Sequence, residues 1–195
     1  MEGSLTDARR IHLVVPEGLE ADADHAGRAT DEPSGYYRAV LDSVASAVSG
    51  GDVVMLAPAN SFGGPMSEHH AGKRYLGSRL PHGVQIECPE GSNASYLDTL
   101  DNAIELRNHL ERIGWWPLGP CTLYCNSPHR MRAVLMFKLL GFDIKDVVTN
   151  RGRQPTSSIV RRLWFYDYLL LHYAYEAGAI PYDLIRFAYF KVTGR

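Results

Sequence analysis

The segment Cys121–Phe142 limits the fold of this chain more than any other part of the sequence. It opens with a short β-type run, Cys121–Cys125, turns sharply, and continues with apolar residues at helical spacing, namely Met131, Val134, Leu135 and Leu139. Ser127 is a good N-cap residue, and Pro128 is a good first residue of a helix. The segment therefore predicts a strand, a tight turn and a helix, which is the repeating unit of open α/β sheets.

The same alternation of strand and helix patterns runs along most of the chain. Apolar runs of strand length occur at residues 11–15, 52–58, 84–88, 121–125 and 143–149, and helical patterns at residues 35–49, 66–76, 96–113 and 128–140. A chain of 195 residues suits one such domain. We therefore predict a doubly wound α/β fold, in which helices flank a mainly parallel sheet.

Two segments do not follow this alternation. Residues 16–34 are acidic and small, with Pro and Gly among them, and are expected to form a long loop, either a solvated insert or a lid. Residues 158–178 are apolar and aromatic on nearly all sides of a helix, and Pro181 begins another helical pattern that ends near Val192. We expect an α/β ligand-binding domain at residues 1–150. A C-terminal helical extension at residues 151–195 would then be packed on it or pair two subunits.

Composition restricts the partners of the chain. The formal net charge of −2 and the lack of a basic stripe give no reason to expect nucleic acid. The segment Leu163–Ala179 is interrupted by charged residues, so we expect no membrane span, and the first residues lack the apolar core of a signal peptide. The three cysteines, Cys88, Cys121 and Cys125, indicate a reduced, cytoplasmic setting.

The first turn of the predicted central helix carries His129, Arg130 and Arg132, just past the carboxyl end of a strand. In open α/β sheets ligands bind at that edge, and a helix N-terminus favours anions. His129 and Arg132 are neighbours on one helical face. Arg132 would therefore bind a phosphate or carboxylate while His129 gives or takes a proton. The alternative is that His129 only caps the helix and Arg132 only pairs with a surface acid.

A second group of candidates follows the strand at residues 52–58. Gly63 and Gly64 permit close approach to a ligand because they have no Cβ, although a plain turn explains them equally well. Glu68 is a candidate base or hydroxyl-binding group, or simply a favourable acid in the first turn of a helix. Asn102 lies in the middle of a helix, where Asn is a poor helix former, and this indicates a polar contact.

The patterns for a metal site or a serine nucleophile are weaker. Residues 68–70, Glu-His-His, together with His82 offer metal-ligating side chains, but no two histidines are four residues apart on a helix, so we expect no metal. Ser61 and Ser127 both lack the Gly-x-Ser-x-Gly elbow of a serine nucleophile.

Residues Asp52–Val148 resemble the YdcF/SanA/ElyC-like family, whose domain is called DUF218. Asn126–Ala133 resembles the family's Thr-Ser-x-x-His-x-x-Arg-Ala segment. Ser95–Ala103 resembles its Ser-x-Asn-Thr-x-Glu-Asn-Ala segment, with one more residue between Ser and Thr in this chain. The Gly-Gly turn followed by Ser67-Glu68 resembles the family's Gly-Gly turn and Ser-Glu entry into a helix. The first strand ends in Val15-Pro16-Glu17 where the family has a Gly-rich turn, and we find no counterpart of the membrane anchor of several relatives. The resemblance implies a Rossmann-like fold, envelope or small-molecule roles and, in one branch, affinity for S-adenosylmethionine.

We therefore expect a Rossmann-like enzyme that binds a small anionic ligand, of the phosphate, nucleotide or sugar-phosphate type, at the strand carboxyl ends. It would be a hydrolase or group transferase with His129 and Glu68 as its acid–base pair. The residues expected to contact the ligand are Asn60, Ser61, Gly63, Gly64, Ser95, Asn102, Asn126, Ser127, Arg130 and Arg132. One alternative is a non-catalytic or S-adenosylmethionine-type ligand-binding module, although the first strand is not followed by the Gly-x-Gly-x-Gly of a standard methyltransferase. Another is a scaffold that forms a homodimer through the aromatic C-terminal helices.

Overall fold

The core of the molecule is a five-stranded parallel sheet. In the computed structural model, which describes residues 9–24, 28–90, 97–150 and 159–193, the strand order is β5-β4-β1-β6-β7, and neighbouring strands are parallel. The strands are Ile11–Val14 (β1), Val53–Leu56 (β4), Gln85–Glu87 (β5), Cys121–Asn126 (β6) and Ile144–Asn150 (β7). β1 and β4 are buried along their whole length, which is why they are apolar apart from the buried His12 of β1. The expected Rossmann-like α/β class is confirmed.

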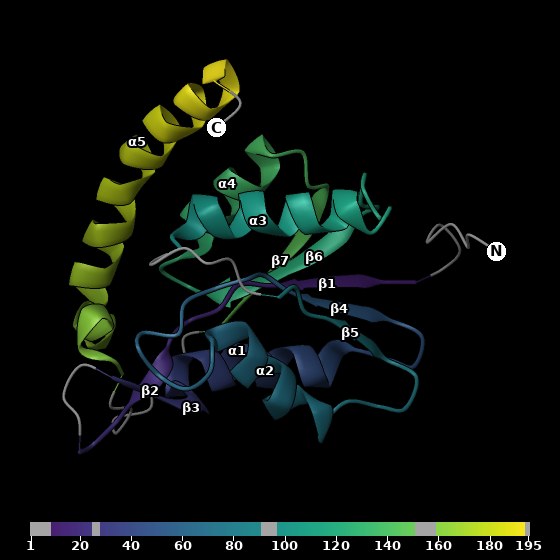
Figure 1. The fold of residues 1–195 in the computed structure, drawn as a ribbon, viewed down its shortest axis with the longest axis horizontal. Coiled ribbons are helices and arrows are strands. Elements are labelled where there is room, and N and C mark those ends of the chain that lie inside the picture. The colour runs from purple at the N-terminus through teal and green to yellow at the C-terminus, as the bar shows by residue number, and fades with distance from the viewer. Residues whose placement is uncertain (1–8, 25–27, 91–96, 151–158, 194–195) are drawn as a thin grey trace.

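Helices cover both faces of the sheet (Figure 1). One face carries α1 (Gly35–Ala47) and α2 (Glu68–Gly77), and the other carries α3 (Thr99–Arg112) and α4 (Arg130–Leu139). Because successive side chains of a strand point to opposite faces, Leu13 belongs to the core cluster that includes α3 and α4, whereas Val14 belongs to the one that includes α1. The winding reverses between β1 and β6. In such sheets ligands bind at this point, outside the carboxyl ends of the strands.

Residues 16–34 do not form the loop that their composition predicted. Instead, β2 (Leu19–Ala21) and β3 (Ala29–Pro33) pair as an antiparallel hairpin. Leu19 is fully buried and packs in one cluster with Ile159 and Leu163. Gly18 has a φ of +93°, and a Cβ there would lie 2.9 Å from both of these side chains. The prediction was wrong because a few apolar residues suffice to anchor a hairpin when another segment covers them.

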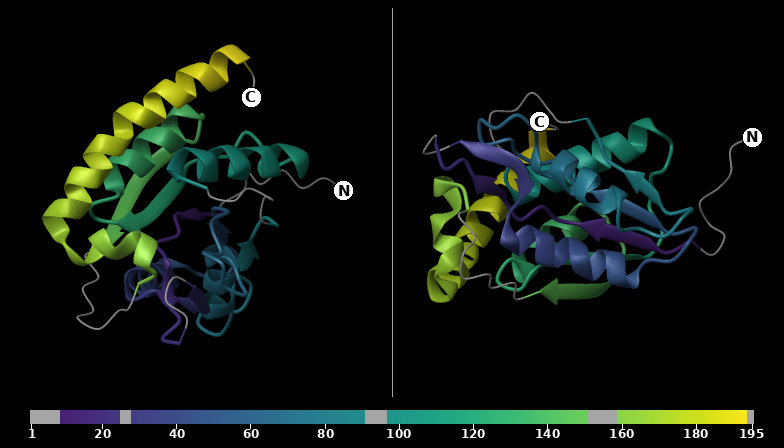
Figure 2. Two further views of the ribbon diagram at one scale, coloured as in Figure 1. Left: turned by 60° about the vertical axis from the view of Figure 1, so that its left-hand side comes forward. Right: turned by 90° about the horizontal axis from the view of Figure 1, so that it is seen from below.

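The C-terminal segment contains one long helix, not the expected pair. A short 3₁₀ helix, η1 (Arg161–Asp167), precedes α5 (Leu169–Thr193), which continues through Pro181. Pro181 has no backbone N–H, so the carbonyl group of Ala177 loses its helical hydrogen bond. Both residues are exposed, so solvent can hydrogen-bond to that carbonyl. α5 runs beside α4 along one end of the molecule (Figure 2). Within the described ranges, no helix is both long and apolar enough to cross a membrane.

α4 begins later than the sequence indicated. Residues 127–129 form a turn, so Ser127 does not cap the helix, and His129 occupies the N-cap position. Met131 was expected on the buried face but is 73% exposed. The buried residues of α4 are Arg132, Ala133, Met136 and Phe137. The buried stripe is therefore displaced by about one residue, and this displacement turns Arg132 inwards.

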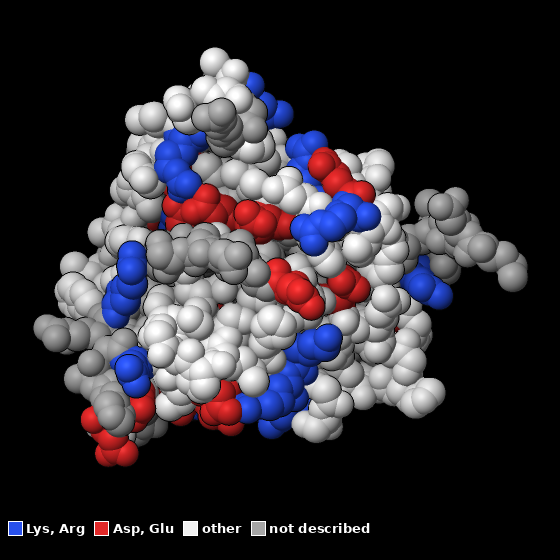
Figure 3. All heavy atoms as spheres, viewed as in Figure 1, with Lys and Arg blue, Asp and Glu red and all other residues white. Residues whose placement is uncertain are grey.

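Charges of both signs are mixed on the surface. On the face shown in Figure 3, Lys and Arg side chains of the described residues lie near Asp and Glu side chains. Two surface pairs of this kind are Arg74–Glu32 and Arg107–Glu111, both with a nitrogen–oxygen distance of 2.8 Å. This face presents no broad field of one sign among the residues that are described, so it would not steer a polyanion.

Candidate functional site

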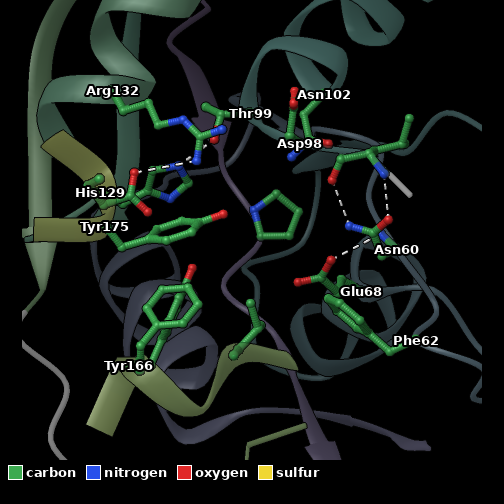
Figure 4. Close-up of a pocket in the computed structure, with 15 residues that line it drawn as sticks. Asn60, Phe62, Glu68, Asp98, Thr99, Asn102, His129, Arg132, Tyr166 and Tyr175 are labelled. Atoms are coloured by element: carbon green, nitrogen blue, oxygen red, sulfur yellow. Dashed lines mark hydrogen bonds and ion pairs between the residues drawn. The ribbon is translucent and has the colours of Figure 1, made fainter. Parts of the chain in front are cut away.

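A small cavity lies at the carboxyl ends of β1, β4 and β6, and residues of α5 form part of its wall. Its volume is about 40 Å³, which is room for roughly three water molecules. His129, Arg132 and Tyr175 lie on one side, and Asn60 and Glu68 lie on the other (Figure 4). The other lining residues are Pro16, Phe62, Leu97, Asp98, Thr99, Asn102, Leu163, Phe165, Tyr166 and Glu176.

A buried chain of hydrogen bonds, Glu17–His129–Thr99, runs along one wall. Nδ1 of His129 lies 3.0 Å from Oε1 of Glu17, and Nε2 lies 2.8 Å from Oγ1 of Thr99. Glu17 is fully buried and also accepts hydrogen bonds from the backbone N–H of Asn126 and the hydroxyl group of Tyr166. A buried acid that orients an imidazole toward a hydroxyl group is an arrangement suited to proton transfer.

His129 carries a positive charge at neutral pH. Burial alone would lower the pKa of its imidazole, but the charges of Glu176 and Glu17 and the hydrogen bond to Glu17 outweigh burial and raise the pKa to about 9. Both ring nitrogens of an imidazolium carry hydrogen, so Nδ1 donates to Glu17 and Nε2 donates to Thr99. The hydroxyl hydrogen of Thr99 is then free to point toward a group in the cavity.

Glu68 is the second titratable group of the cavity, on the side opposite His129 (Figure 4). It is the first residue of α2, and its carboxylate oxygens accept the backbone N–H groups of Gly18 at 2.6 Å and Asn60 at 3.0 Å. Burial raises the pKa of this carboxyl group to about 7, although the two hydrogen bonds oppose the rise. Glu68 therefore exchanges its proton near neutral pH, while His129 remains protonated.

Arg132 is paired with carboxylates from α5. Its Nε atom lies 2.7 Å from Oδ2 of Asp183, and its Nη1 atom lies 3.6 Å from Oε2 of Glu176. Burial would lower the pKa of Arg132, but the hydrogen bond to Asp183 and the charge of Glu176 raise it above its ordinary value. Oε2 of Glu176 is buried and accepts no hydrogen bond from the described residues. Arg132 therefore joins α4 to α5, and Glu176 leaves an acceptor atom at the wall of the cavity.

Two of the three asparagines predicted as ligand contacts, Asn60 and Asn102, connect the segment after β4 to the start of α3. Nδ2 of Asn60 donates to the carbonyl oxygen of Leu97 at 2.8 Å, and the backbone N–H of Leu97 donates to Oδ1 of Asn60 at 2.6 Å. When its amide nitrogen faces the start of α3, Asn102 donates to the carbonyl oxygens of Asp98 and Pro58. Both asparagines line the cavity, but these bonds occupy much of their hydrogen-bonding capacity.

The predicted Gly-Gly turn lies outside the cavity wall. Ser61, Gly63 and Gly64 are absent from the described residues that line it. A Cβ at Gly64 would come within 2.5 Å of the carbonyl oxygen of Ala29. The missing side chain of Gly64 therefore lets the turn pack against β3, and this role needs no ligand.

The remaining candidates of the central segment also point elsewhere. Asn126 contributes its backbone N–H to Glu17, not to the cavity. Arg130 is exposed, and Oγ of Ser127 lies 3.3 Å from the hydroxyl oxygen of Tyr173. Ser95 lies outside the described residues. The structure thus brings together Asn60, Glu68, Asn102, His129 and Arg132 from the residues proposed for the site.

Sequence reasoning missed the acidic residues that surround His129 and Arg132. Glu17 lies three residues after the end of β1, so the rule that led to His129, the carboxyl end of a parallel strand, could have found it. Glu176 and Asp183 are seven residues apart, which places them on one face of an otherwise apolar helix. Two charges so placed indicate a buried polar contact. Thr99 was visible only within the stretch that resembles the DUF218 family.

A group of His69, His70 and Cys88 brings potential metal ligands within 4.8 Å of one another. However, Nδ1 of His69 accepts the backbone N–H of Ala59 at 2.9 Å, and burial lowers the pKa of this ring to about 4. The ring is therefore neutral with its hydrogen on Nε2, so metal binding at either nitrogen would cost that hydrogen bond. Burial also raises the pKa of Cys88 to about 11, which disfavours the thiolate that binds metals. We assign no metal to this group.

No protein-family model matches the chain, and no curated protein or solved structure matches it either. The resemblance to the DUF218 family therefore stays an expectation, and the function has to be inferred from the geometry of the cavity.

Proposed function

We propose that this chain is an enzyme, a hydrolase or group transferase that uses Glu68 as its general base and His129 as its general acid. The observation that supports this proposal is the placement of two groups in different protonation states on opposite sides of one cavity (Figure 4). The pKa of Glu68 is raised to about 7 and that of His129 to about 9. Environments that separate the pKa values of two facing groups are typical of acid–base catalysis.

Each residue has a distinct role in the proposed reaction. The ionised form of Glu68 takes a proton from a water molecule or a ligand hydroxyl group, whose oxygen then attacks the reacting centre. The leaving group takes a proton from Nε2 of His129, directly or through the hydroxyl group of Thr99. Glu17 is a positioning residue, since its carboxylate fixes the ring of His129 and balances its charge.

The charges around the cavity favour a neutral or singly charged ligand that is rich in hydroxyl groups. Among the described residues, the three carboxylates of Glu17, Glu176 and Asp183 already outnumber the two cations of His129 and Arg132, with which they pair. A phosphate monoester with two negative charges would lose its hydration without gaining an unpaired cation. We therefore replace the anionic ligand expected from the sequence with a phosphodiester, a glycoside or an ester. Its reacting group would enter the cavity of about 40 Å³, and its hydroxyl groups would donate hydrogen bonds to Glu176.

A second candidate is a module that binds an S-adenosylmethionine-type ligand, of which only the sulfonium region would enter a cavity of about 40 Å³. The carboxylates of the cavity and the aromatic rings of Tyr166 and Tyr175 suit a positively charged sulfonium group. Such a module requires no proton transfer, so it needs neither the raised pKa of Glu68 nor the charged form of His129.

Matched ligand pairs separate these proposals, because a compound that binds only the folded state raises the melting temperature. The pairs are a nucleoside and its monophosphate, a sugar and its phosphate, and S-adenosylmethionine and the uncharged-sulfur S-adenosylhomocysteine. Each is measured by thermal shift and native mass spectrometry. We expect the neutral member of the first two pairs to bind at least as tightly as the phosphorylated one. Tighter binding of the doubly charged member would contradict the ligand assignment.

Turnover tests the mechanism itself. Phosphodiesters, glycosides and esters of the compounds that bind are offered to the wild type, to Glu68→Gln and to the exposed control Glu111→Gln. We expect turnover that is lost in Glu68→Gln and kept in the control. Turnover that survives in Glu68→Gln would exclude Glu68 as the base. Binding of S-adenosylmethionine, but not of its uncharged analogue, without any turnover would favour the second candidate.

A further inference from the structure

The inner face of α5 is more polar than that of an ordinary surface helix. Its three buried residues, His172, Glu176 and Asp183, are all titratable and face the α/β domain, where Glu176 and Asp183 pair with Arg132. A surface helix normally buries its apolar face and exposes its polar one. Phe187 and Phe190 also pack against the core on the inner side, but most other large apolar residues of α5 are left exposed on the monomer.

A regular stripe of apolar residues marks the outer face of α5. Its members, spaced three and four residues apart, are Leu171, Ala174, Gly178, Pro181, Ile185, Ala188 and Val192. All seven are exposed, and none is ionisable. This spacing is that of the contact positions in paired helices. We call these seven residues the α5 stripe.

The α5 stripe is complementary to itself about Pro181. When a second copy of the helix crosses it in the antiparallel direction at Pro181, the facing pairs are Leu171–Val192, Ala174–Ala188 and Gly178–Ile185. Ile185 of one copy thus meets Gly178 of the other, where a Cβ would touch nothing within 4 Å in the monomer. Each pair then occurs twice, once in each direction, which is the reciprocity that a two-fold symmetric interface requires.

We propose that two copies of this chain form an antiparallel, two-fold dimer through the α5 stripe. Six larger apolar side chains on and beside the stripe are between 47% and 87% exposed, namely Leu170, Leu171, Tyr182, Ile185, Tyr189 and Val192. The two tyrosines, at about 200 Å² for each fully exposed ring, and the four aliphatic side chains together offer several hundred Å² per copy, the order of size of a specific interface. The dimer does not depend on the chemistry proposed for the cavity.

A second copy suits this surface better than a lipid bilayer does. Helices that lie on membranes carry Lys and Arg along their polar face. The described part of α5 has two such residues, Lys191 and Arg186, and Arg186 is paired with Asp98 and Asp101. A recess of about 530 Å³ between η1 and α5, lined in part by Trp164, Leu171 and Ala174, adjoins one end of the stripe. The antiparallel arrangement places the Val192 end of the second copy over this recess.

Sedimentation velocity over about 1 to 100 µM protein tests the dimer. The wild type is expected at twice the 21.7 kDa mass of one chain. Gly178→Leu is expected to be monomeric yet fully folded, since the new side chain has open space in the monomer but collides with Ile185 of the second copy. The double variant Gly178→Leu/Ile185→Ala exchanges the large and small positions and is expected to recover the dimer. Ile113→Glu, which changes an exposed apolar residue at the end of α3, is the control that should remain dimeric.

Three results would overturn the proposal. The first is a wild type that stays monomeric at every concentration. The second is a Gly178→Leu variant that remains a dimer, which would place the contact elsewhere. The third is a monomeric wild type that sediments with phosphatidylcholine or phosphatidylglycerol vesicles, which would assign the surface to lipid. Far-UV circular dichroism confirms that each variant has the helix content of the wild type.

Discussion

The substitution Glu68→Gln should change how stability depends on pH. The pKa of Glu68 rises from 4.5 to about 7 on folding because the carboxyl group is buried. Between these values the folded state holds a proton that the unfolded chain has already lost. The free energy of unfolding therefore falls as the pH rises from about 4.5 to about 7. At about 1.4 kcal/mol per pH unit, Glu68 lowers the stability by about 3 kcal/mol over this range.

Glutamine has nearly the same shape as glutamate but does not titrate. It can accept only one of the two N–H groups that Glu68 accepts, those of Gly18 and Asn60, so the variant should be less stable than the wild type in acid by about 1–3 kcal/mol. As the pH rises, the wild type loses stability through Glu68 and the variant does not. The stability difference should therefore move by about 3 kcal/mol in favour of Gln between about pH 5 and pH 8.

Urea denaturation followed by tryptophan fluorescence at several pH values measures this difference. His129, whose folded pKa is raised to about 9, contributes stability that is present below about pH 6.5 and is lost as the pH rises through about 9. This contribution is common to both proteins and is removed by subtraction. The control Glu111→Gln alters a carboxylate on the surface and should give curves parallel to the wild type. If the curves for Glu68→Gln also run parallel, Glu68 titrates normally and cannot be the base near neutral pH.

Three further outcomes follow from particular contacts. Gly72→Ala should destabilise the fold by about 1–3 kcal/mol, because a Cβ there would lie 2.4 Å from the hydroxyl oxygen of Tyr37. The control Gly77→Ala, where a Cβ would meet nothing within 4 Å, should stabilise the same helix by up to about 1 kcal/mol. Urea denaturation measures both changes. Arg132→Met should destabilise by about 3–5 kcal/mol, because the buried carboxylate of Asp183 loses its partner, and an unchanged melting temperature would contradict this. With a substrate in hand, kcat/KM should rise near pH 7 as the base loses its proton and fall near pH 9 as the acid loses its own.

The parallel sheet was predictable because the properties that specify it are local. β1 and β4 are buried on both faces and therefore consist of apolar residues apart from His12 of β1, and α1 has the apolar periodicity of a helix that covers one face. The hairpin of β2 and β3 was not predictable in this way. Its stability depends on Leu19, which packs against Ile159 and Leu163 about 140 residues further along the chain, and local composition does not contain this contact.

The candidate site was predictable only in part for a related reason. His129 and Glu68 follow strands of the sheet, and the rule that ligands bind at the carboxyl ends of strands places them correctly. Arg132 was expected to bind a ligand or to pair with a surface acid. Its buried partners, Glu176 and Asp183, were not foreseen because they lie more than 40 residues away on a helix expected to be buried through its apolar side chains. The charge balance of the cavity depends on which side of α5 faces inward, and tertiary packing determines that side.

The protonation state of His129 tests the central claim of this account most directly. The measurement is a pH titration of the histidine ring nitrogens by long-range ¹H–¹⁵N NMR, in which His129→Gln identifies the resonances that belong to His129. We predict that both ring nitrogens carry hydrogen at neutral pH and that the ring loses a proton near pH 9, because Glu17 and Glu176 stabilise the charged form. A neutral ring at neutral pH would contradict the role of His129 as the acid and the direction of the hydrogen bond to Thr99.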